Sequence, residues 1–114
     1  GDQVISVRNA GRLREMMADV VRKGGTGTAA AVDGYEVGGK TGSAQIWDPK
    51  ARVYSHKYNA SFLGMVPLNN PKLVIAVTLN GSALYGGVVG APVFHTIAAS
   101  ALRLMDVKKD YDLP

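Results

Sequence analysis

The chain has 114 residues, of which 46% are hydrophobic and 19% are charged, a composition that predicts one globular domain and excludes disorder. Its formal net charge is +4, but the basic residues form no dense tract, so we expect a solvated surface and no nucleic-acid partner. The absence of cysteine excludes disulfides and thiolate chemistry. No apolar stretch approaches the ~20 residues that cross a bilayer and no signal segment opens the chain, so we expect a soluble chain.

The first predicted element is an amphipathic helix from about residue 7 to residue 23. Ser6 suits its N-cap, because a serine hydroxyl accepts a hydrogen bond from the first helical turn. Gly24 and Gly25 follow as a stop signal. The apolar side chains that recur at helical spacing are predicted to form one buried face: Leu13, Met16, Met17, Val20 and Val21.

Three strands are predicted next, at residues 35–46, 60–66 and 73–79. They are rich in β-branched, aromatic and other apolar residues, and turn residues separate them at 48–52 and 67–71. Short polar connections join successive strands as hairpins. The sequence therefore predicts an antiparallel meander.

The remaining segments predict a second helix and little other regular structure. Residues 26–33 are expected to be a loop or a short irregular strand, and residues 81–90 a glycine-rich connection. Pro92 is placed in the first turn of a helix, and residues 108–114 form a polar tail. The stripe of this helix is Phe94, Ile97, Ala98, Ala101, Leu102 and Met105. The fold class is therefore α+β, an antiparallel sheet of about three strands flanked by an N-terminal and a C-terminal helix.

The run from Gly39 to Gln45 fits two unrelated kinds of site. Residues 34–41 match the G-x-x-x-x-G-K-[ST] phosphate loop, whereas Lys40, Thr41 and Gly42 form a K-T-G box. A phosphate loop needs a helix after its hydroxyl residue, and the residues that follow Thr41 are poor helix formers. A strand is therefore favoured. A nucleotide-binding module and a non-catalytic structural or interaction piece are kept as alternatives.

As a strand, the box can form one wall of a cleft. Side chains alternate along a strand, so Lys40 and Gly42 are predicted on one face and Thr41 and Ser43 on the other. Two hydroxyls near a lysine suit a carboxylate, and a backbone N–H on the strand suits an oxyanion. If the box were the only signal, an exposed edge strand with a solubilising lysine would be preferred.

Other stretches accompany the box in a recognisable order. They are Met16-Met17, Val20-Val21, residues 23–28, Gly34-Tyr35, residues 39–45, residues 62–67, Asn70-Pro71, residues 85–87 and residues 91–94. Together they resemble the C-terminal part of the transpeptidase domain of class B penicillin-binding proteins, most closely the division-type peptidoglycan D,D-transpeptidases. The resemblance covers nearly the whole chain, so residues 1–114 are expected to be an incomplete, C-terminal segment of that domain.

The resemblance implies a serine acyl-transferase that attacks the D-Ala-D-Ala end of a peptidoglycan stem peptide and is trapped by β-lactams. It implies no cofactor and no metal. The implied partners are stem peptides, β-lactams, the remainder of the domain and proteins of the division machinery. The implied location is the periplasmic face of the bacterial inner membrane, with an N-terminal anchor helix that this sequence does not contain.

The resemblance assigns catalytic roles to Lys40 and Ser43, with the backbone N–H of Ser43 in the oxyanion hole. The substrate-binding set that it implies is Lys40, Thr41, Gly42, Ser43, Gln45 and Tyr85. Position 43 is usually threonine in the family, and serine keeps the hydroxyl. His56 and His95 lack metal-ligand spacing and are expected in ordinary surface or packing roles, and Trp47 is expected to anchor a turn.

Two motifs of the family are missing. No serine is followed three places later by lysine or two places later by asparagine, so the S-x-x-K nucleophile box and the S-x-N box are both absent. The chain is therefore expected to be inactive alone. We also expect exposed apolar surface where the remainder of the domain would pack, which would favour association with a second polypeptide.

Overall fold

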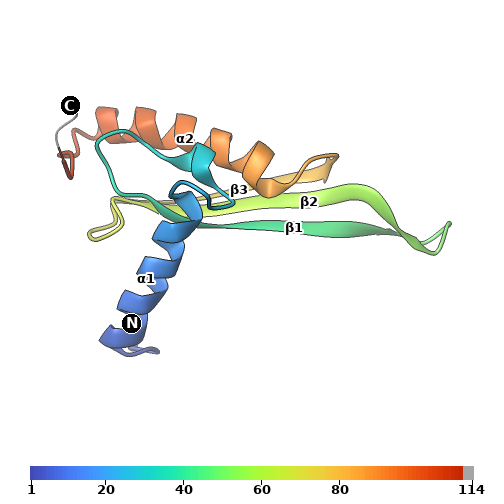
Figure 1. Cartoon of the computed structure of the whole chain (residues 1–114), viewed down its shortest axis with the longest axis horizontal. Coiled ribbons are helices and arrows are strands. Elements are labelled where there is room, and N and C mark those ends of the chain that lie inside the picture. Colours follow the sequence, from blue (N-terminus) through green and yellow to red (C-terminus); the bar gives the residue numbers. More distant parts are fainter. Residues whose placement is uncertain (112–114) are drawn as a thin grey trace.

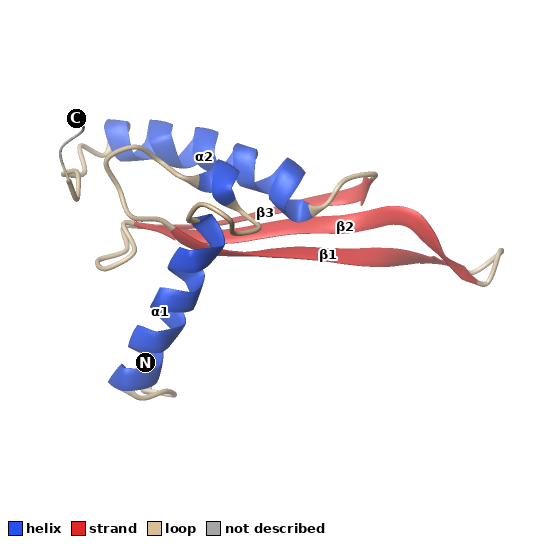
Figure 2. Cartoon of the chain, in the orientation of Figure 1, coloured by secondary structure: helices blue, strands red, loops and turns tan. Residues whose placement is uncertain are grey.

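The computed structural model describes residues 1–111, and its three strands form one antiparallel sheet in the order β1-β2-β3. Helix α2 lies along one face of this sheet, while α1 projects away from it (Figure 1). The described residues hold two α-helices and a short 3-10 turn besides the strands (Figure 2), so the predicted α+β class is confirmed. The elements are α1 (Val7–Val21), η1 (Thr28–Ala30), β1 (Gly38–Asp48), β2 (Val53–Val66), β3 (Leu73–Ser82) and α2 (Gly86–Leu104).

Helix α1 begins as predicted and ends two residues early. The Asn9 N–H donates to the Ser6 hydroxyl at 3.1 Å, which confirms the N-cap. Only its C-terminal end is packed, with Ala18 and Val21 buried. The predicted buried face is wrong for the first turns, because Leu13 is 50% exposed and Met16 is 64% exposed where the helix leaves the sheet (Figure 1).

The hairpin of β1 and β2 is longer than predicted. The strands pair from Gly38 opposite Met65 to Asp48 opposite Val53, so β2 begins seven residues before the predicted start at Ala60. At the tip the Asp48 carboxylate accepts the N–H groups of Lys50 and Ala51 at 2.9 and 3.1 Å. Residues near the tip are largely exposed on both faces, so no alternation of polar and apolar residues marks this part of β2.

Helix α2 begins six residues earlier than the position of Pro92, which lies inside the helix and not in its first turn. The glycine-rich connection predicted at 81–90 is therefore wrong in its second half. Gly86 and Gly90 are buried against the sheet, and their lack of a side chain is a packing requirement and not a loop signal. The segment 26–33 contains η1 and an isolated bridge between Val32 and Tyr35, and no strand.

The core lies between α2 and the sheet. Phe62 of β2 and Phe94 of α2 are fully buried, with ring centroids 5.2 Å apart, a separation typical of favourable aromatic pairs. The opposite face of the sheet is left open, where Leu63 is 45% exposed and Val74 is 65% exposed. The expected exposed apolar surface is thus present on α1 and on this face.

The C-terminal segment packs back onto the residues that precede β1. The Asp110 N–H donates to the Gly34 carbonyl at 2.8 Å, and the Glu36 N–H donates to the Asp110 carboxylate at 2.7 Å. The predicted polar tail is therefore docked over Lys108–Tyr111, and its last residues, 112–114, lie outside the described residues.

Helix α2 corrects the expectation that no apolar stretch approaches membrane-spanning length. It has 19 residues with a mean hydropathy of 1.3 and is, within residues 1–111, the one helix long and apolar enough to cross a bilayer. Its buried side chains face the sheet, Phe94 and Leu102 among them. The outer face of α2 is apolar as well, with Val88 57% exposed and Leu104 83% exposed. The predicted buried stripe is therefore wrong at Ile97, which is 46% exposed.

Candidate functional site

The K-T-G box lies within β1 and not at the start of a helix. Residues 38–48 are continuous strand, and Lys40, Thr41 and Gly42 pair with Leu63, Phe62 and Ser61 of β2. The phosphate-loop hypothesis is therefore wrong, because no helix N-terminus follows Thr41 to receive a phosphate.

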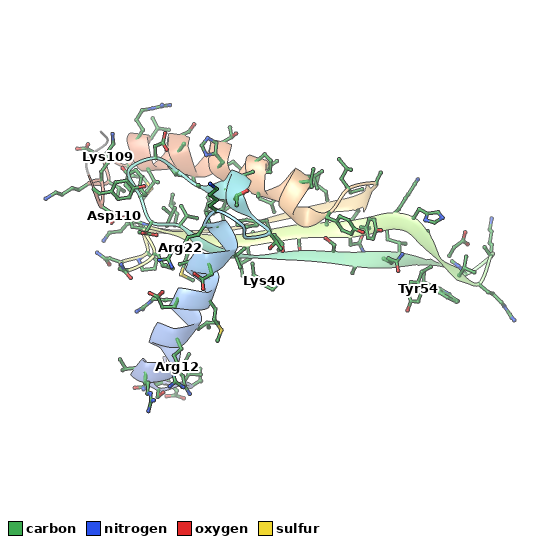
Figure 3. The ribbon with its side chains drawn as sticks, viewed as in Figure 1. Arg12, Arg22, Lys40, Tyr54, Lys109 and Asp110 are labelled. Atoms are coloured by element: carbon green, nitrogen blue, oxygen red, sulfur yellow. The ribbon has the colours of Figure 1, made fainter. Side chains whose placement is uncertain are left out.

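Lys40 contacts the backbone of its own strand, whose other edge is unpaired within the described sheet. The Lys40 ammonium donates to the Thr41 carbonyl at 2.6 Å. The Lys40 side chain leaves the strand on the face of the sheet opposite α2 (Figure 3). Backbone groups alternate in direction along a strand, so if the Thr41 carbonyl points to the free edge, the Ser43 N–H points there as well. A cation and a backbone donor then share one edge.

The hydroxyls of Thr41 and Ser43 lie on the opposite side, as predicted, in a pocket of about 350 Å³. The Ser43 hydroxyl accepts the Gly86 N–H at 3.0 Å, and the Thr41 hydroxyl is 2.9 Å from that of Thr26. The residues that line the pocket are Thr26, Thr41, Ser43, Tyr85, Gly87 and Val88. Two strand hydroxyls and the first turn of α2 therefore meet in one place.

The N-terminus of α2 makes this pocket favourable for an anion. Tyr85 is the N-cap residue and supplies no side-chain hydrogen bond to the first turn. The helix has 19 residues, so its aligned peptide dipoles place partial positive charge at this end. This partial positive charge favours a carboxylate in the pocket, and the Lys40 ammonium contacts the Thr41 carbonyl of the same strand.

Glycines permit the close approach of α2 to the strands. A Cβ on Gly86 would lie 2.2 Å from the Ser61 carbonyl oxygen, and one on Gly87 would lie 2.0 Å from the Thr26 carbonyl oxygen. Neither distance is sterically allowed, and both obstacles are backbone. Glycine at these positions is thus what lets the Gly86 N–H reach Ser43.

Two tyrosines flank the pocket on the side of the hairpin. Tyr85 lines the pocket, and its ring contacts that of Tyr58 with centroids 4.8 Å apart. The Tyr58 hydroxyl donates to the Tyr85 hydroxyl at 3.4 Å. This hydrogen bond, with smaller contributions from desolvation and from the Tyr85 charge, raises the pKa of Tyr58 above its ordinary value.

The Tyr58 pKa gives a direct test of this pair. Tyr85→Phe removes the acceptor, so the Tyr58 pKa should fall back toward the ordinary 10.0. In the unchanged protein the contribution of this hydrogen bond to folding stability is fully present below the ordinary pKa of tyrosine. It is lost as the pH rises through the raised pKa of Tyr58. Tyrosinate absorbance during an alkaline titration measures the change, with Tyr54→Phe as the control. An unchanged Tyr58 titration in Tyr85→Phe would contradict the contact.

The other predicted site residues lie further along the strand or away from it. Gln45 does not line the pocket and donates to the Ser55 carbonyl at 3.4 Å, so its substrate contact stays a prediction. Trp47 stacks edge-on against Tyr54 near the hairpin tip, with centroids 5.2 Å apart. His95 lies within hydrogen-bond distance of the Ala31 carbonyl, at 2.7 Å.

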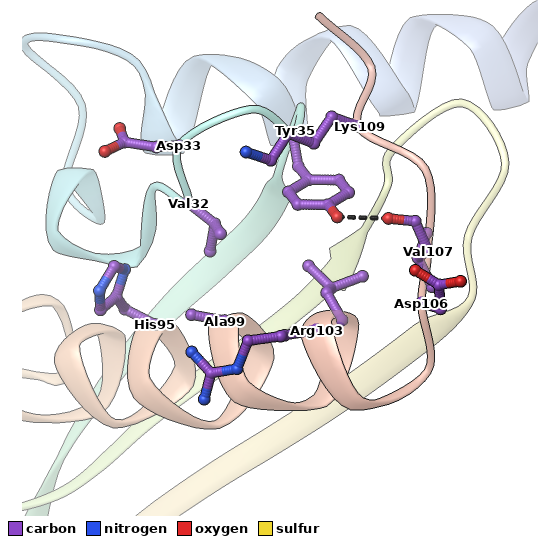
Figure 4. A pocket seen from close by; sticks show the side chains of 10 residues that line it. Val32, Asp33, Tyr35, His95, Ala99, Arg103, Asp106, Val107 and Lys109 are labelled. Atoms are coloured by element: carbon purple, nitrogen blue, oxygen red, sulfur yellow. Dashed lines mark hydrogen bonds between the residues drawn. The ribbon is translucent and has the colours of Figure 1, made fainter. Parts of the chain in front are cut away.

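A larger cavity, of about 460 Å³, lies at the other end of α2 (Figure 4). Its walls combine apolar residues such as Val32 and Ala99 with charges of both signs, Arg103 and Asp106 among them. Tyr35 spans it and donates from its hydroxyl to the Val107 carbonyl. None of the K-T-G residues lines this cavity.

Sequence reasoning missed Thr26, Gly87 and Val88, which line the pocket, and Tyr58, whose ring contacts Tyr85. Thr26 and Tyr58 lie apart from the box along the chain, and only the packing of the loop after α1 and the register of β2 bring them close. A correct register for the hairpin would have placed Tyr58 opposite Gln45. No local signal points to Thr26.

The fold and the site together define an α+β segment in which an edge strand and a helix N-terminus form a hydroxyl-lined pocket, and the Lys40 ammonium contacts the backbone of the same strand. The sequence pattern of the family described as "Penicillin binding protein transpeptidase domain" matches residues 1–99. The chain therefore belongs to the penicillin-binding protein transpeptidase family, and the resemblance to its class B members is confirmed.

Similar proteins and structures agree with this assignment. A probable peptidoglycan D,D-transpeptidase PenA from Neisseria flavescens is 39% identical over 110 residues, which are 94% of this chain and 27% of that protein. The apo transpeptidase domain of Burkholderia pseudomallei penicillin-binding protein 3 matches with a TM-score of 0.86 and 40% identity, over 98% of this chain and 34% of that one. Mycobacterium tuberculosis penicillin-binding protein 3, complexed with ampicillin, matches with a TM-score of 0.83 and 33% identity, over 95% of this chain and 26% of that one. The chain thus spans about a quarter to a third of these proteins.

Proposed function

We propose that this chain supplies the carboxylate-binding and oxyanion wall of a peptidoglycan D,D-transpeptidase. The observation that carries the proposal is the meeting of the Thr41 and Ser43 hydroxyls with the N-terminus of α2, beside the Lys40 ammonium at the strand edge. Hydroxyl groups and the positive end of a helix dipole converge there on one pocket. A peptide that ends in a D-Ala carboxylate suits this arrangement.

The proposed roles follow from the positions of the groups. The hydroxyls of Thr41 and Ser43 bind the substrate carboxylate, with Lys40 adding its positive field and Gly42 keeping the strand thin. The Ser43 N–H, at the free edge, stabilises the oxyanion that forms when the penultimate carbonyl is attacked. Tyr85, paired with Tyr58, forms an aromatic side wall.

The nucleophile is proposed to come from sequence outside residues 1–114. No S-x-x-K or S-x-N box is present here, so residues 1–114 act as the C-terminal segment of the domain. In the complete site a serine oxygen attacks the carbonyl, the C–N bond to the terminal D-Ala breaks, and a seryl ester forms. An amine of a neighbouring stem peptide then attacks that ester and releases the serine. A β-lactam acylates the same serine but leaves no departing amino acid.

Two surfaces support a partner that completes the domain. The face of the sheet opposite α2 and the first turns of α1 expose apolar side chains, among them Val74 and Met16. The edges of β1 and β3 are also unpaired within the described sheet. We place the complete protein at the periplasmic face of the inner membrane, where stem peptides and proteins of the division machinery are available to it.

Fluorescent penicillin labelling tests the proposal. This chain alone should take no covalent label, whereas the complete transpeptidase that carries it should be labelled. Thr41→Ala should weaken that label about tenfold, because one charge-assisted hydrogen bond to the carboxylate is lost. Thr78→Ala, an exposed position on β3, is the matched control. Labelling of the chain alone would show that the nucleophile does not lie elsewhere.

A further inference from the structure

The loop after α1 contributes a third hydroxyl to the pocket. The Thr26 hydroxyl lies 2.9 Å from that of Thr41, although the two residues are 15 positions apart. Thr26 also lines the pocket together with Ser43. Its side chain is exposed, so a ligand in the pocket has access to it.

The backbone around Thr26 is held in place from two sides. The Gly25 N–H donates to the Arg22 carbonyl at 2.8 Å, and the Gly27 N–H donates to the Val20 carbonyl at 2.8 Å. On the other side the first turn of α2 leaves no room, since a Cβ on Gly87 would lie 2.0 Å from the Thr26 carbonyl oxygen. These contacts hold the backbone that presents the Thr26 hydroxyl to Thr41.

Counting hydrogens shows what this contact does. Each hydroxyl has one hydrogen to donate, and the Thr26–Thr41 contact uses one of the two. If Thr26 donates, the Thr41 hydrogen is left free to point into the pocket. The Ser43 hydroxyl accepts the Gly86 N–H, so its own hydrogen is free as well. Two free O–H donors then face the same space.

We propose that Thr26 is a positioning residue for the carboxylate site, an inference that rests on the proposed function. By donating to Thr41 it sets the direction of the Thr41 hydrogen and polarises that hydroxyl, so the Thr41 O–H becomes a better donor to a carboxylate. The contact also restricts the Thr41 side chain before the ligand arrives, which lowers the entropy cost of binding.

The test compares acylation of the complete transpeptidase by a penicillin and by the methyl ester of the same penicillin. Thr26→Val keeps the branched shape and removes the hydroxyl, whereas Thr26→Ser keeps the hydroxyl. For the free acid we expect Thr26→Val to lower the second-order acylation rate about fivefold, the effect of one hydrogen bond. Thr26→Ser should restore the rate. For the ester, which lacks the carboxylate, Thr26→Val should change nothing.

Controls separate this inference from the proposed function. Thr28→Val, at an exposed threonine with no described hydrogen bond to its hydroxyl, should match the unchanged protein. Thr41→Val should show the same selectivity for the acid, and Thr26→Val added to Thr41→Val should cost little more. If Thr41→Val slows acylation by the acid more than by the ester and Thr26→Val does not, the Thr26 role is overturned and the proposed function stands. If neither variant distinguishes acid from ester, both are overturned. Equal loss with acid and ester in Thr26→Val, or no rescue by Thr26→Ser, also overturns the role of Thr26.

Discussion

Gly86→Ala should destabilise the chain by about 3 kcal/mol, at the upper end of the usual cost of overpacking. The new methyl group would lie 2.2 Å from the Ser61 carbonyl oxygen and 2.5 Å from the Gly42 carbonyl oxygen. Both obstacles are strand backbone, so relief requires α2 to move off the sheet. The same movement would break the hydrogen bond from the Gly86 N–H to Ser43, and the pocket would be lost together with stability.

Thermal unfolding followed by circular dichroism measures this effect, and a drop of roughly 10 °C or more is expected for a domain of this size. Gly11→Ala is the matched control, because a Cβ on Gly11 meets nothing within 4 Å. Gly11 lies within α1, where replacing glycine by alanine should stabilise the helix by up to about 1 kcal/mol. If Gly86→Ala and Gly11→Ala melt alike, the close packing of α2 on the strands is wrong.

Lys40→Ala should lower the acylation rate of the complete transpeptidase by about 10²- to 10³-fold, the range measured when one preorganised electrostatic group is removed from an oxyanion-type site. The Lys40 ammonium donates to the Thr41 carbonyl. Its side chain is exposed, so the loss should fall on the reaction and leave the melting temperature nearly unchanged.

Stopped-flow acylation with a chromogenic β-lactam gives the rate. Lys57→Ala, an exposed lysine of β2 near the hairpin tip, removes the same charge at a distance and should change the rate less than twofold. Comparable losses in the two variants would mean that Lys40 acts only through net charge, and the proposed role at the site would then be abandoned.

The pattern of apolar residues was enough to predict the elements and their class. Ser6 and the glycines at 24 and 25 bound α1 to within two residues, because capping is a local interaction. The alternation along β1 placed Thr41 and Ser43 on one face and Lys40 on the other, and the pocket confirms this. The resemblance assigned the family from short stretches in a fixed order.

Errors arose where a local signal depended on packing. The glycines before Pro92 predicted a loop, yet Gly86 and Gly90 are helical because α2 presses its backbone against β2. Leu13 and Met16 predicted a buried face, yet they are exposed since nothing in the described chain covers the first turns of α1.

The sequence by itself determined the class of fold, because this follows from residue type and spacing within each element, and its ordered stretches carried the resemblance to the family. Only the tertiary structure decided which groups share the pocket. A loop brings Thr26 to Thr41, the start of α2 brings the Gly86 N–H to Ser43, and the register of β2 brings Tyr58 to Tyr85. These contacts join residues far apart in the chain, and no local pattern of side chains records a distance set by how the backbone packs.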